Sequence, residues 1–235
     1  MEDYKACILA GGIGRRMENF TKHFNKAMLP LEGKPVINHI IEKFPDETEI
    51  VVSIGYLGDG LREYVTTAYP DRKLSFVEDD RFTERGRRGP GYGLLQCRNF
   101  LQCPFIVSAV DTLVKESVPE PKKNWFGLAR VENTERFCSA KVSKGMVTRI
   151  DDKVKTDNEF AFIGLAGIKD YETFWNALEL NQDTIGGEIQ LSNGLVSLIE
   201  RDLYARVFTW FDVGAPESYV HAIRNYPLGD SYRGE

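Results

Sequence analysis

Short apolar runs, separated by polar, glycine-rich or proline-rich segments, dominate the first half of the chain. The runs that predict buried strands lie at 6–9, 49–54, 74–77 and 105–110, with a further short apolar run at 28–31. Helical spacing, or a proline suited to the first helical position, predicts helices at 35–44, 57–69 and 93–100. This alternation indicates an α/β fold with a mostly parallel sheet and helices on both of its faces.

The second half of the chain is richer in strands. Its predicted strands lie at 125–131, 139–142, 147–150, 160–168 and 205–210. Its predicted helices lie at 171–178, 191–200 and 216–225. No repeat or low-complexity linker interrupts the chain, so we predict a single domain over 1–228, with halves at 1–111 and 112–228, and a flexible tail over 229–235.

The bulk composition narrows the class of protein. The chain has 235 residues, of which 42% are hydrophobic and 28% charged, as is typical of a soluble globular protein. Its net charge of −5 argues against a nucleic-acid-binding protein, which needs a basic face. No apolar stretch approaches the ~18 residues of a membrane span, and the N-terminus lacks the pattern of a signal peptide. We therefore expect no membrane partner and a cytoplasmic location.

A glycine-rich turn follows the first predicted strand. It comprises Leu9, Ala10, Gly11, Gly12, Ile13 and Gly14. Such a turn lets backbone N–H groups approach a phosphate, although a plain tight connection would also use glycine. The turn is not a dinucleotide fingerprint, because Met17 stands where the third glycine is needed, and no Walker A sequence is present.

Two cations downstream of the turn, Arg16 and Lys26, could neutralise the charge of a triphosphate. With them, the stretch 8–30 resembles the N-terminal signature of the sugar-1-phosphate nucleotidyltransferases, also called nucleoside-diphosphate-sugar pyrophosphorylases. That signature reads L-A-G-G-x-G-x-R-[LM], followed by P-K-x-[ML]-x-P. Arg16 and Lys26 match its arginine and lysine, and Asn25 stands where the pattern has proline.

The resemblance implies roles for these residues in binding a nucleoside triphosphate. Arg16 would hold the β- and γ-phosphates, and Lys26 would touch the reacting phosphate groups. The nucleotide-binding backbone would come from Leu9, Ala10, Gly11, Gly12 and Gly14. The segment 89–95 stands in the place of the family's base-contacting loop, which implies nucleotide contacts by Gly91 and Gly93. Its amino-acid sequence differs from the family's, so the identity of the base stays open.

Two aspartates in separate parts of the chain match the family's metal ligands. Asp111 follows a predicted central strand, and the carboxyl ends of such strands are where open α/β sheets bind ligands. Asp212 lies in W-F-D-V-G-A-P-E-S-Y, which resembles the family's W-x-D-x-G-T-P-E-S-[YL] segment. Together with phosphate oxygens and waters, two such hard oxygen ligands suit Mg²⁺, which the resemblance implies as cofactor.

Weaker matches lie on the side that would bind the phosphorylated acceptor. The pair Asp152-Lys153 resembles the family's E-K pair, whose lysine grips the acceptor phosphate. Gly164 matches a glycine of the following strand, and Glu188 matches a residue that contacts an acceptor hydroxyl. Two acidic family residues are replaced nearby, by Gln190 and Asn193, so the acceptor stays open. The cations Arg85, Arg87 and Arg88 precede the base-contacting loop and are expected to lie on a solvated surface.

The resemblance as a whole implies an enzyme with a Rossmann-like, nucleotide-diphospho-sugar transferase type of fold, in a short form without a C-terminal repeat extension. The half 1–111 would bind the nucleotide, and 112–228 would bind the acceptor. The implied reaction transfers a nucleoside monophosphate to a sugar-1-phosphate and releases pyrophosphate, for cell-surface glycan biosynthesis. Two alternatives stay open: a CTP-dependent enzyme acting on a non-sugar phosphate or phosphonate, such as phosphocholine or glycerol phosphate, and a non-catalytic nucleotide-binding regulatory subunit. Assembly into a homo-oligomer is also left open.

Overall fold

A nine-stranded sheet runs through both halves of the chain in this computed structural model, which describes residues 4–79 and 89–227. Its strands, in sheet order, are β5 (Leu74–Glu78), β4 (Glu49–Ile54), β1 (Lys5–Ala10), β6 (Phe105–Ala109), β11 (Phe160–Ile168), β8 (Trp125–Arg130), β12 (Tyr204–Val207), β10 (Met146–Asp152) and β9 (Cys138–Ser143). Two small pairs stand apart from it: β7 (Thr112–Val114) with β13 (Trp210–Asp212), and β2 (Pro30–Leu31) with β3 (Lys34–Pro35).

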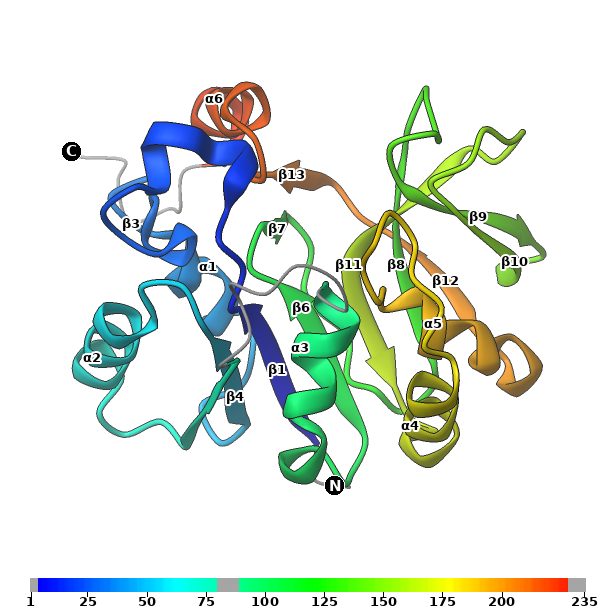
Figure 1. Ribbon diagram of the computed structural model, residues 1–235, viewed down its shortest axis with the longest axis horizontal. Helices are drawn as coiled ribbons and strands as arrows, with labels where there is room; N and C mark the ends of the chain where they lie inside the picture. The colour runs from blue at the N-terminus through cyan, green and yellow to red at the C-terminus, as the bar shows by residue number, and fades with distance from the viewer. Residues whose placement is uncertain (1–3, 80–88, 228–235) are drawn as a thin grey trace.

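Helices cover both faces of this sheet (Figure 1). The α-helices are α1 (Val36–Ile41), α2 (Gly58–Ala68), α3 (Pro90–Gln96), α4 (Tyr171–Leu180), α5 (Ser192–Leu195) and α6 (Pro216–Asn225). The 3₁₀ helices are η1 (Arg15–Thr21), η2 (Lys26–Met28), η3 (Arg98–Phe100) and η4 (Val196–Arg201). Within the described residues, no helix is both long enough and apolar enough to span a bilayer.

The period of two along β1 explains why the sheet has two separate cores. Ala6 and Ile8 point to one face and pack in a cluster with residues of α1 and α2. Cys7, between them, points to the other face and packs in a second cluster with residues of α3 and α4. A strand buried on both faces appears in sequence as a continuous apolar run, which is why the strands of the first half were predictable.

The strand-rich half extends the same sheet. The strands β5, β4, β1 and β6 are parallel, and β11 then pairs antiparallel with β6 and with β8. The strand β12 is parallel to β8, and β10 and β9 complete the edge in antiparallel pairing. The predicted α/β fold, parallel in its first half and mixed in its second, is confirmed.

The structure differs from the predicted elements around β7 and β13. β7 was not predicted, and the strand expected at 205–210 is instead two strands, β12 and β13, in two different sheets. Strands this short carry too little alternation to be read from sequence. The predicted helices at 93–100 and 191–200 each continue into a 3₁₀ turn. The arginines of 85–88 and the tail at 229–235 lie outside the described residues.

Candidate active site

The glycine-rich turn begins where β1 ends, at the carboxyl edge of the parallel strands (Figure 1). Gly14 has φ 69°, a left-handed conformation that favours glycine, and it precedes η1. The turn lies tightly against the loop after β4, because a Cβ on Gly55 would stand 2.5 Å from the carbonyl oxygen of Gly11. The amide of Tyr56 also donates to that oxygen, at 3.4 Å. The loop after β4 therefore fixes the backbone of the turn by close packing and a hydrogen bond.

Lys26 and Asp111, 85 residues apart in sequence, form the centre of the site. The ammonium of Lys26 donates to Oδ2 of Asp111 at 2.6 Å, and the lysine side chain is only 9% exposed. A guanidinium nitrogen of Arg16 lies 3.6 Å from the same oxygen, on a side chain that is 65% exposed. The structure thus brings together both cations and the first aspartate. Lys26 is fixed in place, whereas Arg16 reaches in from solvent.

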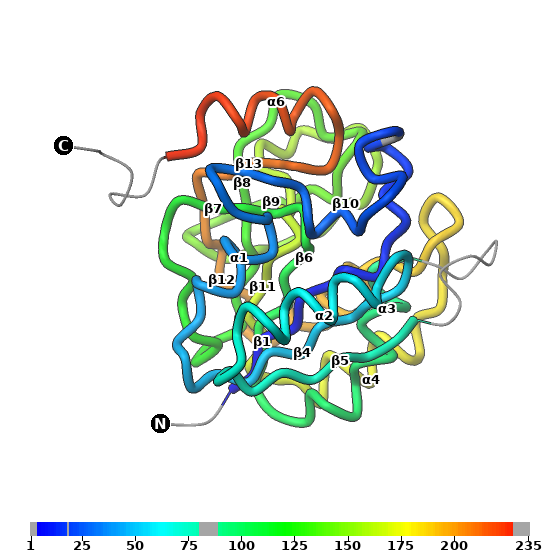
Figure 2. The backbone as a smooth tube through the Cα atoms, turned by 90° about the vertical axis from the view of Figure 1, so that its left-hand side faces the viewer, coloured from blue at the N-terminus to red at the C-terminus, as the bar shows by residue number. Residues whose placement is uncertain are grey.

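Asp212 joins this centre through the small β7–β13 pair. The register sets Asp212 opposite Thr112, and the amide of Val213 donates to the carbonyl of Asp111 at 3.0 Å. A Cβ on Gly214 would lie 2.7 Å from Oδ1 of Asp212 and 3.0 Å from both Asp111 Oδ2 and the Arg16 guanidinium. The three charged groups therefore surround one point. Figures 1 and 2, at right angles to each other, both place β13 and α6 beyond the ends of the parallel strands.

The two aspartates differ in their electrostatics. Burial opposes ionisation of Asp111, but the charges of Lys26 and Arg16 outweigh burial and leave its pKa below the usual carboxyl value. Burial, joined by the negative charge of Asp111, raises the pKa of Asp212 above the usual value. Hydrogen bonds from Ser218 and from the amide of Gly214 oppose that rise without cancelling it. Asp212 is therefore a carboxylate short of positive charge.

This donor set fits a hard divalent cation. Asp111 and Asp212 supply carboxylate oxygens around a common point, and a cation there would relieve the unfavourable charge of Asp212. Among residues 4–79 and 89–227, no group of three or more His, Cys, Asp or Glu side chains gathers at metal-binding spacing. Mg²⁺ commonly keeps several waters and binds only one or two carboxylates plus substrate phosphates, so two aspartates suit its usual coordination.

The predicted base-contacting glycines lie on α3 and pack against another part of the chain. The amide of Gly91 donates to the carbonyl of Ile189 at 3.0 Å, and a Cβ on Gly91 would stand 2.6 Å from the carbonyl oxygen of Gln190. A Cβ on Gly93 would have only ordinary contact, 3.6 Å from the hydroxyl of Ser53. Gly91 is thus required by packing, whereas Gly93 has room beside it.

The predicted acceptor residues are less tightly organised. Lys153 is exposed and has φ 54°, and its ammonium would lie 3.7 Å from a Cβ on Gly186, in the turn that leads to Glu188. Glu188 is exposed and accepts a hydrogen bond from Gln190 at 3.2 Å. Gly164, at φ 78°, lies against β6, because its Cβ would stand 2.8 Å from the Cβ of Ala109. Lys153 and Glu188 therefore share one neighbourhood, and Gly164 lies beside the strand that leads to Asp111.

Two residues of the centre were not predicted as site residues. Gly214 lies among the charged groups, and its signal was the glycine of the W-x-D-x-G pattern that it matches. Asn25 is 1% exposed, and its side-chain amide donates to the carbonyls of Ala10 and Tyr56. Its signal was the departure from the proline of the family pattern.

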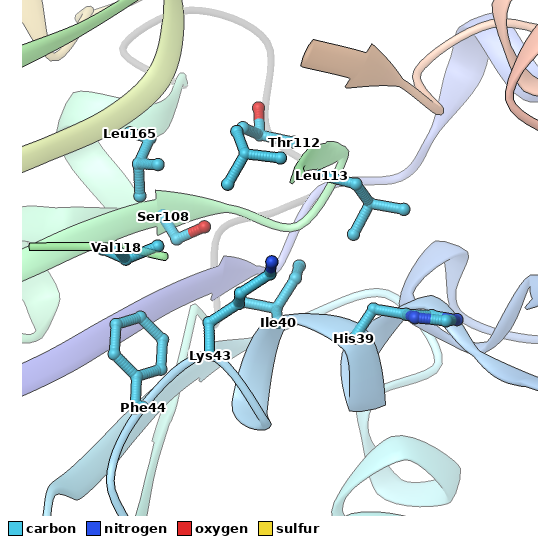
Figure 3. A pocket seen from close by; sticks show the side chains of 10 residues that line it. His39, Ile40, Lys43, Phe44, Ser108, Thr112, Leu113, Val118 and Leu165 are labelled. Carbon is cyan, nitrogen blue, oxygen red and sulfur yellow. The ribbon is translucent and has the colours of Figure 1, made fainter. Parts of the chain in front are cut away.

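A separate pocket lies between α1 and the β6–β7 segment (Figure 3). It is shallow, with a space of about 250 Å³ that includes open solvent, and its lining contains no carboxylate. Its polar groups are already engaged: His39 bonds the carbonyl of Leu31, and Lys43 bonds the carbonyls of Lys115 and Glu116. This pocket has no carboxylate to hold a divalent cation, and its lysine is already bonded to backbone carbonyls, so the centre at Asp111 is the better candidate.

Comparison with known proteins bears on the class of protein to which this chain is similar. Residues 6–118 match the MobA-like NTP transferase domain. The chain is 30% identical to the bifunctional protein GlmU of Methanococcus vannielii, over 95% of this chain and 55% of that protein. It is 26% identical to the low-salt glycan biosynthesis nucleotidyltransferase Agl11 of Haloferax volcanii, over 93% of this chain and 64% of that one. The chain thus spans about half the length of its GlmU relatives.

Solved structures show the same fold. A protein from Bacillus anthracis, described as a glucose-1-phosphate thymidylyltransferase, superposes with a TM-score of 0.80 at 21% identity, over 99% of this chain and 100% of that one. The CTP:phosphocholine cytidylyltransferase LicC of Streptococcus pneumoniae superposes with a TM-score of 0.76 at 17% identity, over 96% and 100% of the two chains. The resemblance to nucleotidyltransferases seen in the sequence is confirmed by the domain match, the relatives and the fold.

Proposed function

We propose that this chain is a nucleotidyltransferase that transfers a nucleoside monophosphate from a nucleoside triphosphate to a sugar-1-phosphate, forming a nucleoside-diphosphate sugar and pyrophosphate. The observation that carries the proposal is the cluster at Asp111, where two cations and a second carboxylate meet at the carboxyl end of a parallel sheet. Charge of this kind at this place suits phosphates and a divalent cation. The Agl11 relative favours a role in the biosynthesis of cell-surface glycans.

The proposed reaction is a single in-line displacement. An oxygen of the acceptor phosphate attacks the α-phosphorus, a new P–O bond forms, and the bond to the bridging oxygen of the β-phosphate breaks. Pyrophosphate leaves with the electron pair of that bond. The attacking oxygen is already anionic, so the step needs no general base. Its rate must come from positioning and from neutralisation of charge.

Each charged side chain has a part in that scheme. Lys26, held on Asp111 at 2.6 Å, would bind reacting phosphate oxygens, and the exposed Arg16 would close on the departing pyrophosphate. Lys153 would hold the acceptor phosphate. Mg²⁺ held by Asp111 and Asp212 would supply further neutralisation of phosphate charge.

Transfer of CMP to a non-sugar phosphate, such as phosphocholine, is the first alternative. The superposition on a CTP:phosphocholine cytidylyltransferase over nearly the whole chain favours it. The acceptor residues leave the choice open, because Lys153 and Glu188 are both exposed and would suit a range of phosphorylated groups.

A regulatory subunit that binds nucleotide without turnover is the second alternative. The pairing of the buried Lys26 with Asp111 and the raised pKa of Asp212 argue against it. A site used for binding alone has no need to hold two carboxylates around one point at an electrostatic cost.

Release of pyrophosphate by the purified chain tests these readings. Five triphosphates (ATP, CTP, GTP, UTP and dTTP) would be paired in Mg²⁺ with hexose-1-phosphates, heptose-1-phosphate, phosphocholine and glycerol phosphate, and products identified by mass. We expect a nucleoside-diphosphate sugar from at least one pairing, and none from Asp111→Asn. A product only from CTP with phosphocholine or glycerol phosphate would replace the sugar assignment. Nucleotide binding without release in any pairing would establish the regulatory alternative.

A further inference from the structure

Asn25 is a buried side chain whose amide donates two hydrogen bonds and accepts one. Its Nδ2 donates to the carbonyl of Ala10 at 3.0 Å and to the carbonyl of Tyr56 at 2.8 Å. Its Oδ1 accepts from the amide of Ala27 at 2.9 Å, which caps η2. A primary amide has two donor hydrogens and one acceptor oxygen, so each is used. The residue that follows is Lys26.

These bonds join three segments that are far apart in sequence. Ala10 ends β1 and begins the glycine-rich turn, Tyr56 follows β4, and Asn25 is the N-cap of η2. Tyr56 strengthens the junction, because its amide donates to Gly11 at 3.4 Å and its hydroxyl donates to the carbonyl of Lys22 at 3.2 Å. The glycine-rich turn, the loop after β4 and the start of η2 are thus one hydrogen-bonded unit.

We propose that Asn25 is a positioning residue, which fixes the ammonium of Lys26 and the glycine-rich turn at one distance from each other. The proposal rests on the proposed nucleotide transfer, in which both groups act on the same triphosphate. Asn25 touches no substrate in this scheme and acts through its neighbours. The backbone of Asn25, at φ −63° and ψ 143°, is one that proline also adopts, so a proline here would preserve the chain path without any of the three side-chain bonds.

The geometry explains why loss of these bonds would affect catalysis. Lys26 has 9% of its side chain exposed and one ion-pair partner, Asp111, so its place depends on the short η2 that carries it. Without Asn25, the cap of η2 is lost, and the carbonyls of Ala10 and Tyr56 lose a buried donor. A displacement of about 1 Å in a positioning group can cost about 100-fold in rate.

The test compares Asn25→Asp and Asn25→Ala with a matched control, Asn124→Ala. Asp keeps the oxygen that accepts from Ala27 and loses both donors, whereas Ala loses all three bonds without adding charge. Asn124 is 2% exposed and equally well bonded, with its amide donating to Asp170 and Arg201, but it lies at the opposite end of the sheet, where β8 begins. All proteins are assayed well below their melting temperatures.

Two readouts are needed. The first is kcat/KM for the triphosphate, which we expect to fall about 100-fold in both Asn25 variants and less than about 3-fold in Asn124→Ala. The second is labelling of lysines with an amine-reactive reagent, read by mass spectrometry with Lys141 on β9 as internal reference. We expect the labelling of Lys26 to rise about fivefold or more in the Asn25 variants, since burial and the ion pair that protect it depend on its position.

Each outcome decides a separate question. If Lys26 stays protected in Asn25→Ala, or becomes labelled while kcat/KM is unchanged, Asn25 does not position Lys26 for the reaction. An equal loss of kcat/KM in Asn124→Ala would show a general effect of instability and would also overturn the proposal. If the wild-type chain releases no pyrophosphate, the proposed function fails, and the labelling comparison still tests whether Asn25 holds Lys26.

Discussion

The charged centre at Asp111 and the proposed acceptor side at Lys153 show two ways of organising a site. Lys26 is 9% exposed and bonded to Asp111 at 2.6 Å, whereas Lys153 and Glu188 are both exposed. The first region holds its charges in place before any substrate arrives. On the second side, a substrate would have to order the side chains itself, at a cost in conformational entropy. The difference predicts that changes at the centre affect turnover, while changes on the acceptor side affect binding.

Replacement of Asp111 is the test of that difference with the largest expected effect. Asp111→Asn removes a proposed metal ligand and the partner of both Lys26 and Arg16, so we expect turnover to fall about 1,000-fold or more. Asp157→Asn is the control. Asp157 is an exposed carboxylate that lies outside the centre and pairs with Lys141 at 2.7 Å, so we expect this change to leave turnover nearly unaltered. Pyrophosphate release measures both. Near-normal turnover of Asp111→Asn in Mg²⁺ would remove the basis of the comparison.

A methyl group at Gly214 tests whether the charged groups truly surround one point. Gly214→Ala places a Cβ within 3.0 Å of Asp111 Oδ2 and Arg16, and 2.7 Å from Asp212 Oδ1, so at least one must move. We expect kcat to fall about 100-fold, the effect of a small displacement in preorganised groups. Gly60→Ala is the matched control, because nothing lies within 4 Å of its Cβ on α2. It should keep wild-type kcat and gain slightly in stability.

The sequence predicted most of the fold but not the contacts that make the centre. The helix at 216–225 and the strand at 49–54 have the bounds that were expected, because long elements carry their periodicity in sequence. β7 has three residues and pairs with a strand about a hundred residues later, so local pattern could not reveal it. The same short pair carries Asp212 to Asp111.

The candidate site shows the same limit. The family pattern indicated Lys26 and Asp111 separately, but their 2.6 Å contact spans 85 residues and depends on the sheet order. In the sequence, Asn25 is only a departure from that pattern, since the carbonyls that it binds are brought near it by folding. On the acceptor side, exposed side chains have few partners to specify them, so neither sequence nor fold determines which acceptor they bind.

Loss of the acceptor-side lysine should have a smaller effect of a different kind. Lys153→Met removes a charge that would meet the acceptor phosphate, so we expect its KM for the acceptor to rise about 10-fold, with KM for the triphosphate unchanged. Steady-state kinetics with each substrate varied in turn measures the two constants. Lys155→Met is the control, as a second exposed lysine two residues away. A fall in kcat alone would show that Lys153 belongs functionally to the charged centre.

The smallest expected effect is on stability, and it concerns the cost of holding the centre in place. The pKa of Asp212 is raised above its ordinary value of 3.8 by burial and by Asp111, so the folded chain binds the Asp212 proton more tightly than the unfolded chain does. The contribution of Asp212 to folding stability therefore falls as pH rises from the ordinary pKa through the raised one. At neutral pH the full cost of holding Asp212 ionised is present. Asp111 has a lowered pKa, so its effect on folding stability is the opposite. It stabilises the folded chain at pH values above the ordinary carboxyl pKa, and this stabilisation is lost as pH falls through the lowered pKa.

Asp212→Asn should therefore stabilise the metal-free protein while abolishing turnover. The asparagine oxygen can still accept from the amide of Gly214, so the turn is kept while the charge and one acceptor oxygen are lost. In EDTA at pH 7 we expect the melting temperature to rise by about 2–4 °C, the shift that about 1 kcal/mol gives in a chain of this size. The gain should shrink on acidification toward pH 3.8, where wild-type Asp212 is itself protonated. Glu188→Gln, on the acceptor side, should leave the melting temperature unchanged, and an equal gain there would mean that the electrostatic cost is not particular to the charged centre.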